Sequence, residues 1–74
     1  MQFPIGSTVK LAMWTGDDQI DYYHGQVLTV TEFRLIPVLA SNMPITYEPP
    51  IPNYSLLAPD SVVITANEYE LEAA

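Results

Sequence analysis

The clearest strand in this sequence covers residues 26–33, Gln-Val-Leu-Thr-Val-Thr-Glu-Phe. The run is rich in β-branched residues, which favour the pleated surface of a sheet. Gly25 precedes the run, and glycine commonly marks the boundary between a loop and a regular element. We therefore expect a β-strand here, with partner strands before and after it in the chain.

Apolar and polar residues alternate over residues 8–14, and this period of two predicts a strand with one buried face. The apolar set is Val9, Leu11 and Met13. Residues 34–39 are expected to form a third strand. Pro37 should confine that strand to an edge or a bulge, because proline has no amide proton to donate.

The second half of the sequence predicts a hairpin and a short closing segment. Residues 54–57 and 61–65 are two expected strands that flank a tight turn at residues 58–60, Ala-Pro-Asp. A single helical turn with Asn67 as its cap should follow. Residues 69–72 then alternate as one more extended segment.

Two loops complete the expected fold. Residues 15–25 form a long acidic loop, and residues 40–53 contain four prolines, which should exclude a central strand there. A sheet this short must curl to bury residues from both ends of the chain in one core, namely Val9, Leu11, Val62 and Ile64. We predict an all-β fold, a small five-stranded partly open barrel with a long acidic first loop and a Pro-rich middle loop. It should be a single domain over residues 1–74.

Charge narrows the class of partner. The net charge is −7, and only Lys10 and Arg34 are positive. Nucleic-acid binding and attraction to anionic membranes both depend on clustered Lys and Arg. We therefore expect no direct contact with nucleic acid or membrane. The expected partner is a protein with a basic or apolar surface.

Cysteine is absent, which favours a reducing, cytoplasmic location. The first residues have neither a basic start nor an apolar run, so we expect no signal peptide. The longest apolar run, residues 35–40, is broken by Pro37 and is too short to cross a bilayer.

Four short motifs resemble those of small Src-homology-3-like (SH3-like) barrel proteins. They are Phe3-x-x-Gly6-x-x-Val9-x-Leu11, Gly25-x-Val27-x-x-Val30, Tyr54-x-Leu56 and Glu68-x-x-Leu71-Glu72. Many such proteins are encoded by bacteriophages, prophages and their bacterial hosts. The resemblance implies the barrel fold and carries no function, because this fold hosts many roles. The aromatic start and tandem tryptophan of proline-binding SH3 domains are missing, as are the basic residues of RNA-binding barrels, so neither activity is expected.

Catalysis is not expected. His24 is the only histidine, and as a general base it would need a nucleophile and an orienting carboxylate. Asp21 lies three residues before His24, but loop neighbours of this kind are common by chance, and a histidine on a surface loop is expected. Asp17, Asp18, Asp21 and His24 lack the alternate spacing of a calcium loop. We predict no enzyme, no metal and no cofactor, and a solvated acidic turn in their place.

The acidic loop is instead a candidate partner site. Its candidate residues are Trp14, Asp17, Asp18, Asp21, Tyr22 and Tyr23. Tyr and Trp are the residues that most often anchor protein interfaces. The alternative is structural, with Trp14 capping the barrel and one tyrosine packed under the loop.

The Pro-rich segment is the second candidate, because it is too apolar for an idle linker. Its candidate residues are Met43, Ile45, Tyr47 and Ile51. They either fold back over one end of the barrel or are presented to another subunit or target. An extended arm of this kind could add a strand to a partner sheet.

These features together predict a non-enzymatic protein–protein interaction module that binds and modulates or inhibits a host or viral protein. The resemblance to SH3-like barrel proteins implies that a phage encodes it, in which case its cytoplasmic location is that of the host cell. A structural, self-assembling virion component is one alternative, which makes the protein a possible homo-oligomer. The other alternative is an acidic nucleic-acid mimic that inhibits a host enzyme. In that case Glu68, Glu70 and Glu72, on one face of the closing strand, would join the aspartates of the loop in one patch.

Overall fold

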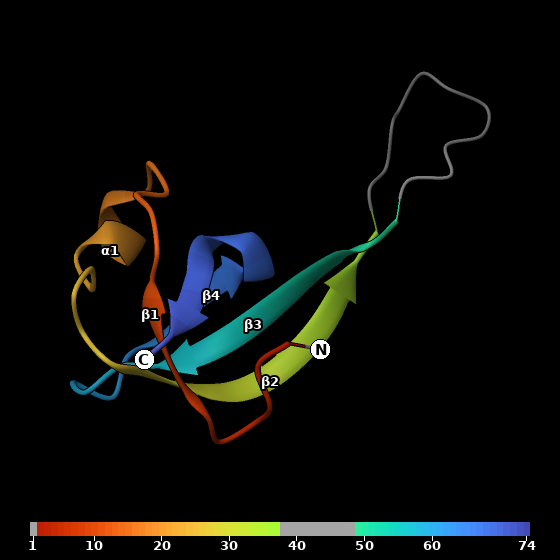
Figure 1. Ribbon diagram of the computed structural model, residues 1–74. Helices are drawn as coiled ribbons and strands as arrows, with labels where there is room; N and C mark the ends of the chain where they lie inside the picture. The colour runs from red at the N-terminus through yellow and green to blue at the C-terminus, as the bar shows by residue number, and fades with distance from the viewer. Residues whose placement is uncertain (1, 38–48) are drawn as a thin grey trace.

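The computed structural model describes residues 2–37 and 49–74. Within these residues, five antiparallel strands form one sheet in the order β4-β3-β2-β1-β5 (Figure 1). The strands are β1 (Thr8–Leu11), β2 (Leu28–Ile36), β3 (Ile51–Leu57), β4 (Val63–Asn67) and β5 (Leu71–Ala73). The predicted all-β class is confirmed. The sheet is not closed, because β4 and β5 lie at its two edges.

β2 is the longest strand and contacts both halves of the sheet (Figure 1). It pairs with β1 at its start and with β3 along its length. A bulge at Thr31 shifts the register between Val30 and Glu32, so the inward-facing positions change parity within the strand. The third strand predicted at residues 34–39 is wrong where the structure describes it, since residues 34–36 continue β2 and Pro37 follows its last residue; residues 38 and 39 lie outside the described residues.

β3 begins at Ile51, inside the segment whose prolines were expected to exclude a central strand. Backbone groups of a strand point alternately to its two neighbours. The amide of Ala58 donates to the Val62 carbonyl at 2.9 Å, so the backbone of Pro52, six residues earlier, also faces the β4 side. β4 ends at Asn67, opposite Asn53. The missing amide proton of Pro52 therefore falls just beyond the end of β4 and breaks no hydrogen bond of the ladder.

Two short helical segments complete the described residues. α1 (Asp18–Asp21) lies within the predicted loop 15–25, where no helix was expected. The 3-10 helix η1 (Glu68–Glu70) follows β4. The predicted cap at Asn67 is confirmed, and its amide donates to Glu70 Oε1 at 2.8 Å. The turn starts one residue after this cap, so the closing strand is shorter than predicted and contains neither Glu68 nor Glu70.

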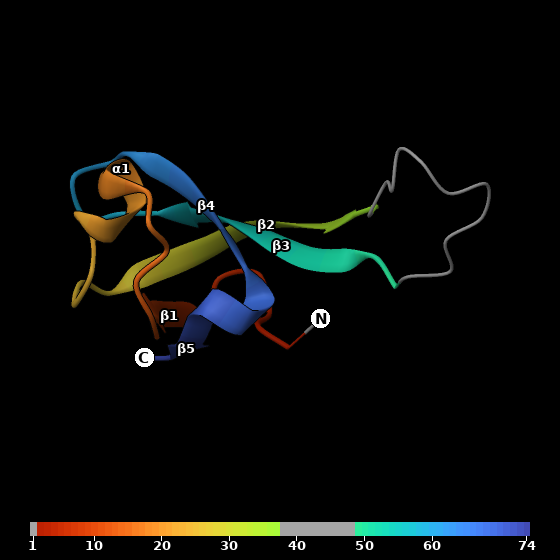
Figure 2. The same cartoon turned by 90° about the horizontal axis from the view of Figure 1, so that it is seen from above.

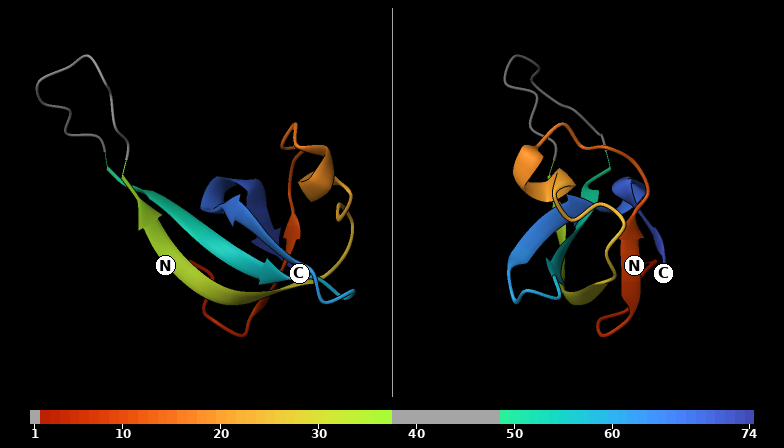
Figure 3. Two further views of the ribbon diagram at one scale, coloured as in Figure 1. Left: turned by 180° about the vertical axis from the view of Figure 1, so that it is seen from behind. Right: turned by 90° about the vertical axis from the view of Figure 1, so that its left-hand side faces the viewer.

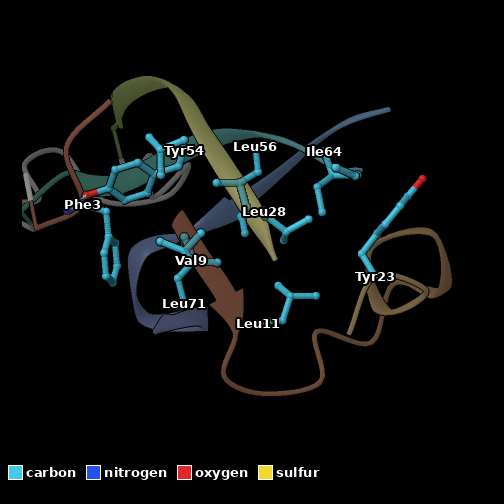
Figure 4. Close-up of a cluster of buried hydrophobic side chains, with 12 residues drawn as sticks. Phe3, Val9, Leu11, Tyr23, Leu28, Tyr54, Leu56, Ile64 and Leu71 are labelled. Atoms are coloured by element: carbon cyan, nitrogen blue, oxygen red, sulfur yellow. Dashed lines mark hydrogen bonds between the residues drawn. The ribbon is translucent and has the colours of Figure 1, made fainter. Parts of the chain in front are cut away.

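One hydrophobic cluster lies between the strands (Figure 4). Its most buried side chains come from the three strands β1, β2 and β3: Val9, Leu28, Val30, Tyr54 and Leu56. Phe3, from the segment before β1, packs edge-on against Tyr54 with 5.7 Å between the ring centroids. Val9, Leu11 and Ile64 are buried as predicted. Met13 and Val62 are exposed, because β1 ends before Met13 and Val62 belongs to the β3–β4 turn.

Candidate partner-binding groove

Asp21 shapes the loop that precedes α1. Its Oδ1 accepts hydrogen bonds from the backbone amide and the hydroxyl of Thr15, both at 2.8 Å, and its Oδ2 accepts from the amide of Gly16 at 3.1 Å. These donors hold the pKa of the Asp21 carboxyl below its ordinary value, the Thr15 amide contributing most. The carboxylate thus stabilises the loop from within.

Asp17 begins α1 as its N-cap. Its side chain accepts from the amide of Gln19 at 2.9 Å, the usual role of Asp at this position. Ile20 then packs against the core cluster and fixes the helix to the sheet. Asp18 and Gln19 remain exposed.

Tyr23 connects this helical turn to the β3–β4 turn. Its ring is buried, with 6% exposure, and its hydroxyl donates to Asp60 Oδ2 at 2.8 Å. The bond to this carboxylate raises the pKa of Tyr23, since ionising the phenol would remove the donor and place two negative charges together. The other oxygen of Asp60 accepts from the Val62 amide at 3.1 Å. Tyr23 and Asp60 therefore hold α1 beside the start of β4.

An open groove lies between these two elements. Its volume is about 460 Å³, within the range of small-ligand and peptide sites. Its lining residues are Asp18, Gln19, Tyr22 and Tyr23 on the helical side and Val62, Val63 and Ile64 on the strand side. Tyr22 is 71% exposed and Val63 is 59% exposed, so both walls present free apolar surface. Figure 2 and the left-hand view of Figure 3 show α1 and the start of β4 at the same end of the molecule, away from the end of β2 and the start of β3.

Trp14 lies outside the lining of the groove. Its indole stacks on the His24 ring with 3.9 Å between centroids and 13° between planes, and it is otherwise exposed. The structural alternative is therefore half correct, since Tyr23 packs under the loop, whereas Trp14 caps no part of the core. His24 therefore packs against an exposed indole. Among the described residues, no nucleophilic side chain is hydrogen-bonded to His24.

The two cations of the chain lie away from the groove. Arg34 donates to Asn53 Oδ1 at 2.6 Å, to Glu32 Oε2 at 3.0 Å and to Ser55 Oγ, on the opposite face of the sheet from Tyr54 and Leu56. Lys10 is on β1, opposite Glu72 of β5. The carboxylates of Asp18 and Asp60 consequently give the groove a negative potential with no cation among its lining residues.

The other predicted site residues are dispersed. Met43, Ile45 and Tyr47 lie outside the described residues. Ile51 is half-buried, pairs with Ile36 and lies at the end of the β2–β3 hairpin that points away from α1 (Figure 1). The structure therefore brings together Asp18, Tyr22 and Tyr23 from the prediction and leaves Ile51 apart from them.

The terminal glutamates do not share one face of a strand as expected. Glu68 accepts from the hydroxyl of Tyr54, and Glu70 accepts from the Asn67 amide. Both belong to η1, and only Glu72 belongs to β5. The nucleic-acid-mimic alternative predicted that these three glutamates lie on one face of the closing strand, and β5 contains only one of them.

Three lining residues on β4 and the turn before it escaped the sequence prediction as site residues. The signal was present, because Val62, Val63 and Ile64 are consecutive and a half-buried strand can turn only alternate residues inward. A run of three apolar residues at such a strand leaves at least one exposed. Here two are exposed, and both line the groove.

No three His, Asp or Glu side chains lie close enough to hold a metal ion in the part of the chain that the structure describes. In residues 2–37 and 49–74, no helix is long and apolar enough to span a membrane. Tyrosine, valine and carboxylate groups favour an apolar ligand with positive charge.

The hydrogen bonds of Asp21 predict a local response to acid. The pKa of Asp21 is lower in the folded protein than its unfolded value of 3.8, so the stabilisation that the ionised carboxylate gives to the folded state is complete above pH 3.8. It is lost as pH falls through the folded-state value. Asp21→Asn should remove that acid dependence and speed hydrogen exchange at the amides of Thr15 and Gly16 at neutral pH. Trp14, the only tryptophan and the neighbour of Thr15, reports the same change by fluorescence.

The matched control is Asp18→Asn, an exposed aspartate of the same helical turn. It should leave the exchange of both amides unchanged. Equal exchange rates in the wild type and Asp21→Asn would contradict the role given to the Asp21 carboxylate.

Comparison with known proteins gives no further assignment. No protein-family model, no curated protein and no solved structure matches this chain. The residues and their geometry are therefore the basis for assigning a function.

Proposed function

We propose that this chain is a non-enzymatic protein–protein interaction module whose partner binds in the groove between α1 and β4. The observation that carries the proposal is that Tyr22 and Val63, both exposed, line opposite walls of an open, negatively charged groove. Aromatic and aliphatic anchors flanked by charge are typical of interface centres. The partner surface should be basic with apolar side chains.

The finer fold assignment belongs to the same proposal. The chain is an SH3-like barrel protein of phage or bacterial origin that modulates its partner in the cytoplasm of the host cell. The β2-β3-β4 meander, with β1 beside β2 and β5 outermost, supports the SH3-like assignment. The sequence motifs that carry the resemblance support it too, since Phe3, Val9, Leu11 and Leu56 are core residues.

The groove can be tested without knowing the partner. A library of random peptides is selected on the immobilised wild type, and the enriched peptides are measured against two double variants. Tyr22→Ser with Val63→Ser removes one tyrosine and one aliphatic anchor from the groove. Tyr69→Ser with Leu35→Ser removes the same two types from exposed positions elsewhere, where Tyr69 is 64% and Leu35 is 55% exposed.

We expect the groove variant to weaken the enriched peptides by roughly tenfold or more, which corresponds to the loss of one modest interface anchor. The control variant should change their affinity by less than about twofold. Enriched peptides that bind the wild type and the groove variant equally would place the binding site elsewhere and contradict the proposal.

A further inference from the structure

The free edge of β4 lies directly beside the groove. β4 is the outermost strand of the sheet and pairs only with β3 among the described residues. Backbone N–H and C=O groups of successive residues in a strand point alternately to its two sides. The Val62 carbonyl accepts from the Ala58 amide, so the backbone groups of Ile64 and Ala66 also point toward β3. Val63 and Thr65 then direct theirs outward. The Asn67 amide also points away from β3, since it donates to the side chain of Glu70.

In residues 2–37 and 49–74, this edge lacks the charged residues, prolines and bulges that normally prevent strand addition. Natural edges are protected by charged residues, prolines, bulges or very short strands. β5, at the other edge, has three residues and carries Glu72. β4 has five residues, Val-Ile-Thr-Ala-Asn, with no charge and no proline, and its register with β3 is regular. An open edge of this kind is a template for an extended chain.

The charges around the edge determine which chain fits it. Asp60 precedes β4, Glu68 follows it, and Asp18 lies across the groove. A second copy of this chain would bring a net charge of −7 and the same carboxylates to the edge. A basic segment would instead gain favourable electrostatic interactions at both ends and across the groove.

We propose that β4 accepts an extended basic segment of a partner protein as an added strand. This inference rests on the proposed function and specifies how that groove is used. Side chains of a strand alternate, so one set of the added residues faces the apolar wall made by Tyr22. Backbone hydrogen bonds to Val63 and Thr65 supply the pairing, and lysine or arginine side chains meet Asp18, Asp60 and Glu68.

The probe is a capped seven-residue peptide, Lys-Val-Lys-Val-Lys-Val-Lys, whose affinity for the wild-type protein is measured by calorimetry. Two isomers carry three backbone N-methyl groups each, one on the valines and one on the first three lysines. A strand pairs through only one of its two edges, and N-methylation of that edge removes its donors. One isomer should bind roughly tenfold more weakly or worse, and the other should stay within about threefold of the parent.

Two further measurements accompany the affinities. Hydrogen exchange at the amides of Val63 and Thr65 should slow when the parent peptide binds. Thr65→Pro removes an outward amide that the β3–β4 ladder does not use, so the sheet should remain folded while peptide binding is lost. The N-methyl comparison uses the wild-type protein, so it tests the inference even if Thr65→Pro does not fold.

Several results would overturn the inference and leave the proposed function standing. Equal binding of both N-methylated isomers would show contact without strand addition. Absence of binding at about 1 mM, or equal binding of the Glu-Val counterpart, would reject the basic strand. A wild-type dimer dissociated by Thr65→Pro would assign the edge to a second copy. The groove itself is judged separately, by the selected peptides and the Tyr22→Ser, Val63→Ser variant.

Discussion

Phe3→Ala should destabilise the protein by about 3–4 kcal/mol, the usual cost of removing a buried aromatic ring from a core. Phe3 is 6% exposed and packs against Tyr54, although it precedes the first strand of the sheet. A domain of this length has a free energy of unfolding of about 4–11 kcal/mol, so the loss is a large part of the total. The melting temperature should fall by at least roughly 12 °C.

Thermal and urea unfolding, followed by circular dichroism, measure this effect. The matched control is Ile5→Ala, which truncates an exposed residue of the same segment and should cost less than about 0.5 kcal/mol. Equal melting temperatures for the wild type and Phe3→Ala would mean that residues 2–7 do not complete the core.

The motif that suggested SH3-like barrels can now be explained by what its residues do. In Phe3-x-x-Gly6-x-x-Val9-x-Leu11, Phe3, Val9 and Leu11 are core residues. Gly6 has a φ of +89°, a conformation that glycine adopts without steric cost, and its amide donates to the Val30 carbonyl of β2. The motif therefore specifies packing and a turn, and residues of this kind carry no information about a partner.

Periodicity predicted most of the strands and failed where neighbouring strands decided the outcome. Pro52 is compatible with β3 because β4 ends at Asn67, and no local pattern around Pro52 records where another strand stops. The bulge at Thr31 could not be predicted for the same reason, since it depends on how β2 pairs with β3. Residues 34–36 were predicted to begin a third strand that contained Pro37, whereas they continue β2 and Pro37 follows the end of that strand.

The candidate site was predictable in its residue types and less so in its geometry. The tyrosines and aspartates of the first loop were evident from the sequence, and Asp18 and Tyr22 do line the groove. Asp21 was grouped with them, yet its carboxylate is used by Thr15 and Gly16. Composition cannot distinguish a carboxylate that faces a partner from one that caps backbone amides, because both are acidic residues in a polar loop.

The pairing of α1 with β4 depends on a contact across 37 positions of sequence, from the Tyr23 hydroxyl to Asp60. A tyrosine and an aspartate so far apart give no recognisable spacing. The groove arises from that contact, so the strand half of the site could be found only once the fold was known. The consecutive Val62, Val63 and Ile64 indicated exposed apolar surface without indicating what lies opposite.

Tyr54→Phe should destabilise the protein by about 2 kcal/mol, although it removes a single oxygen atom. That hydroxyl accepts from the amides of Gln2 and Phe3, at 3.1 and 3.2 Å, and donates to Glu68. The Phe3 amide is buried and would lose its partner, which is the costly case for a hydrogen bond. The melting temperature should fall by roughly 8–16 °C, against a negligible change for Tyr22→Phe, whose ring is exposed and whose hydroxyl has no hydrogen-bond partner among the described residues.

The same variant should alter the response to alkali. Burial, and then the hydrogen bond to Glu68, raise the pKa of Tyr54 above its ordinary value of 10.0. Because the pKa of Tyr54 is higher in the folded protein, the stabilisation that the neutral hydroxyl gives to the folded state is complete below pH 10.0. It is lost as pH rises through the folded-state pKa. Wild-type stability should therefore fall more steeply than that of Tyr54→Phe above this pH, as urea unfolding at increasing pH would measure. Parallel curves would contradict the role of the buried hydroxyl, which joins the segment before β1 to η1 across the core.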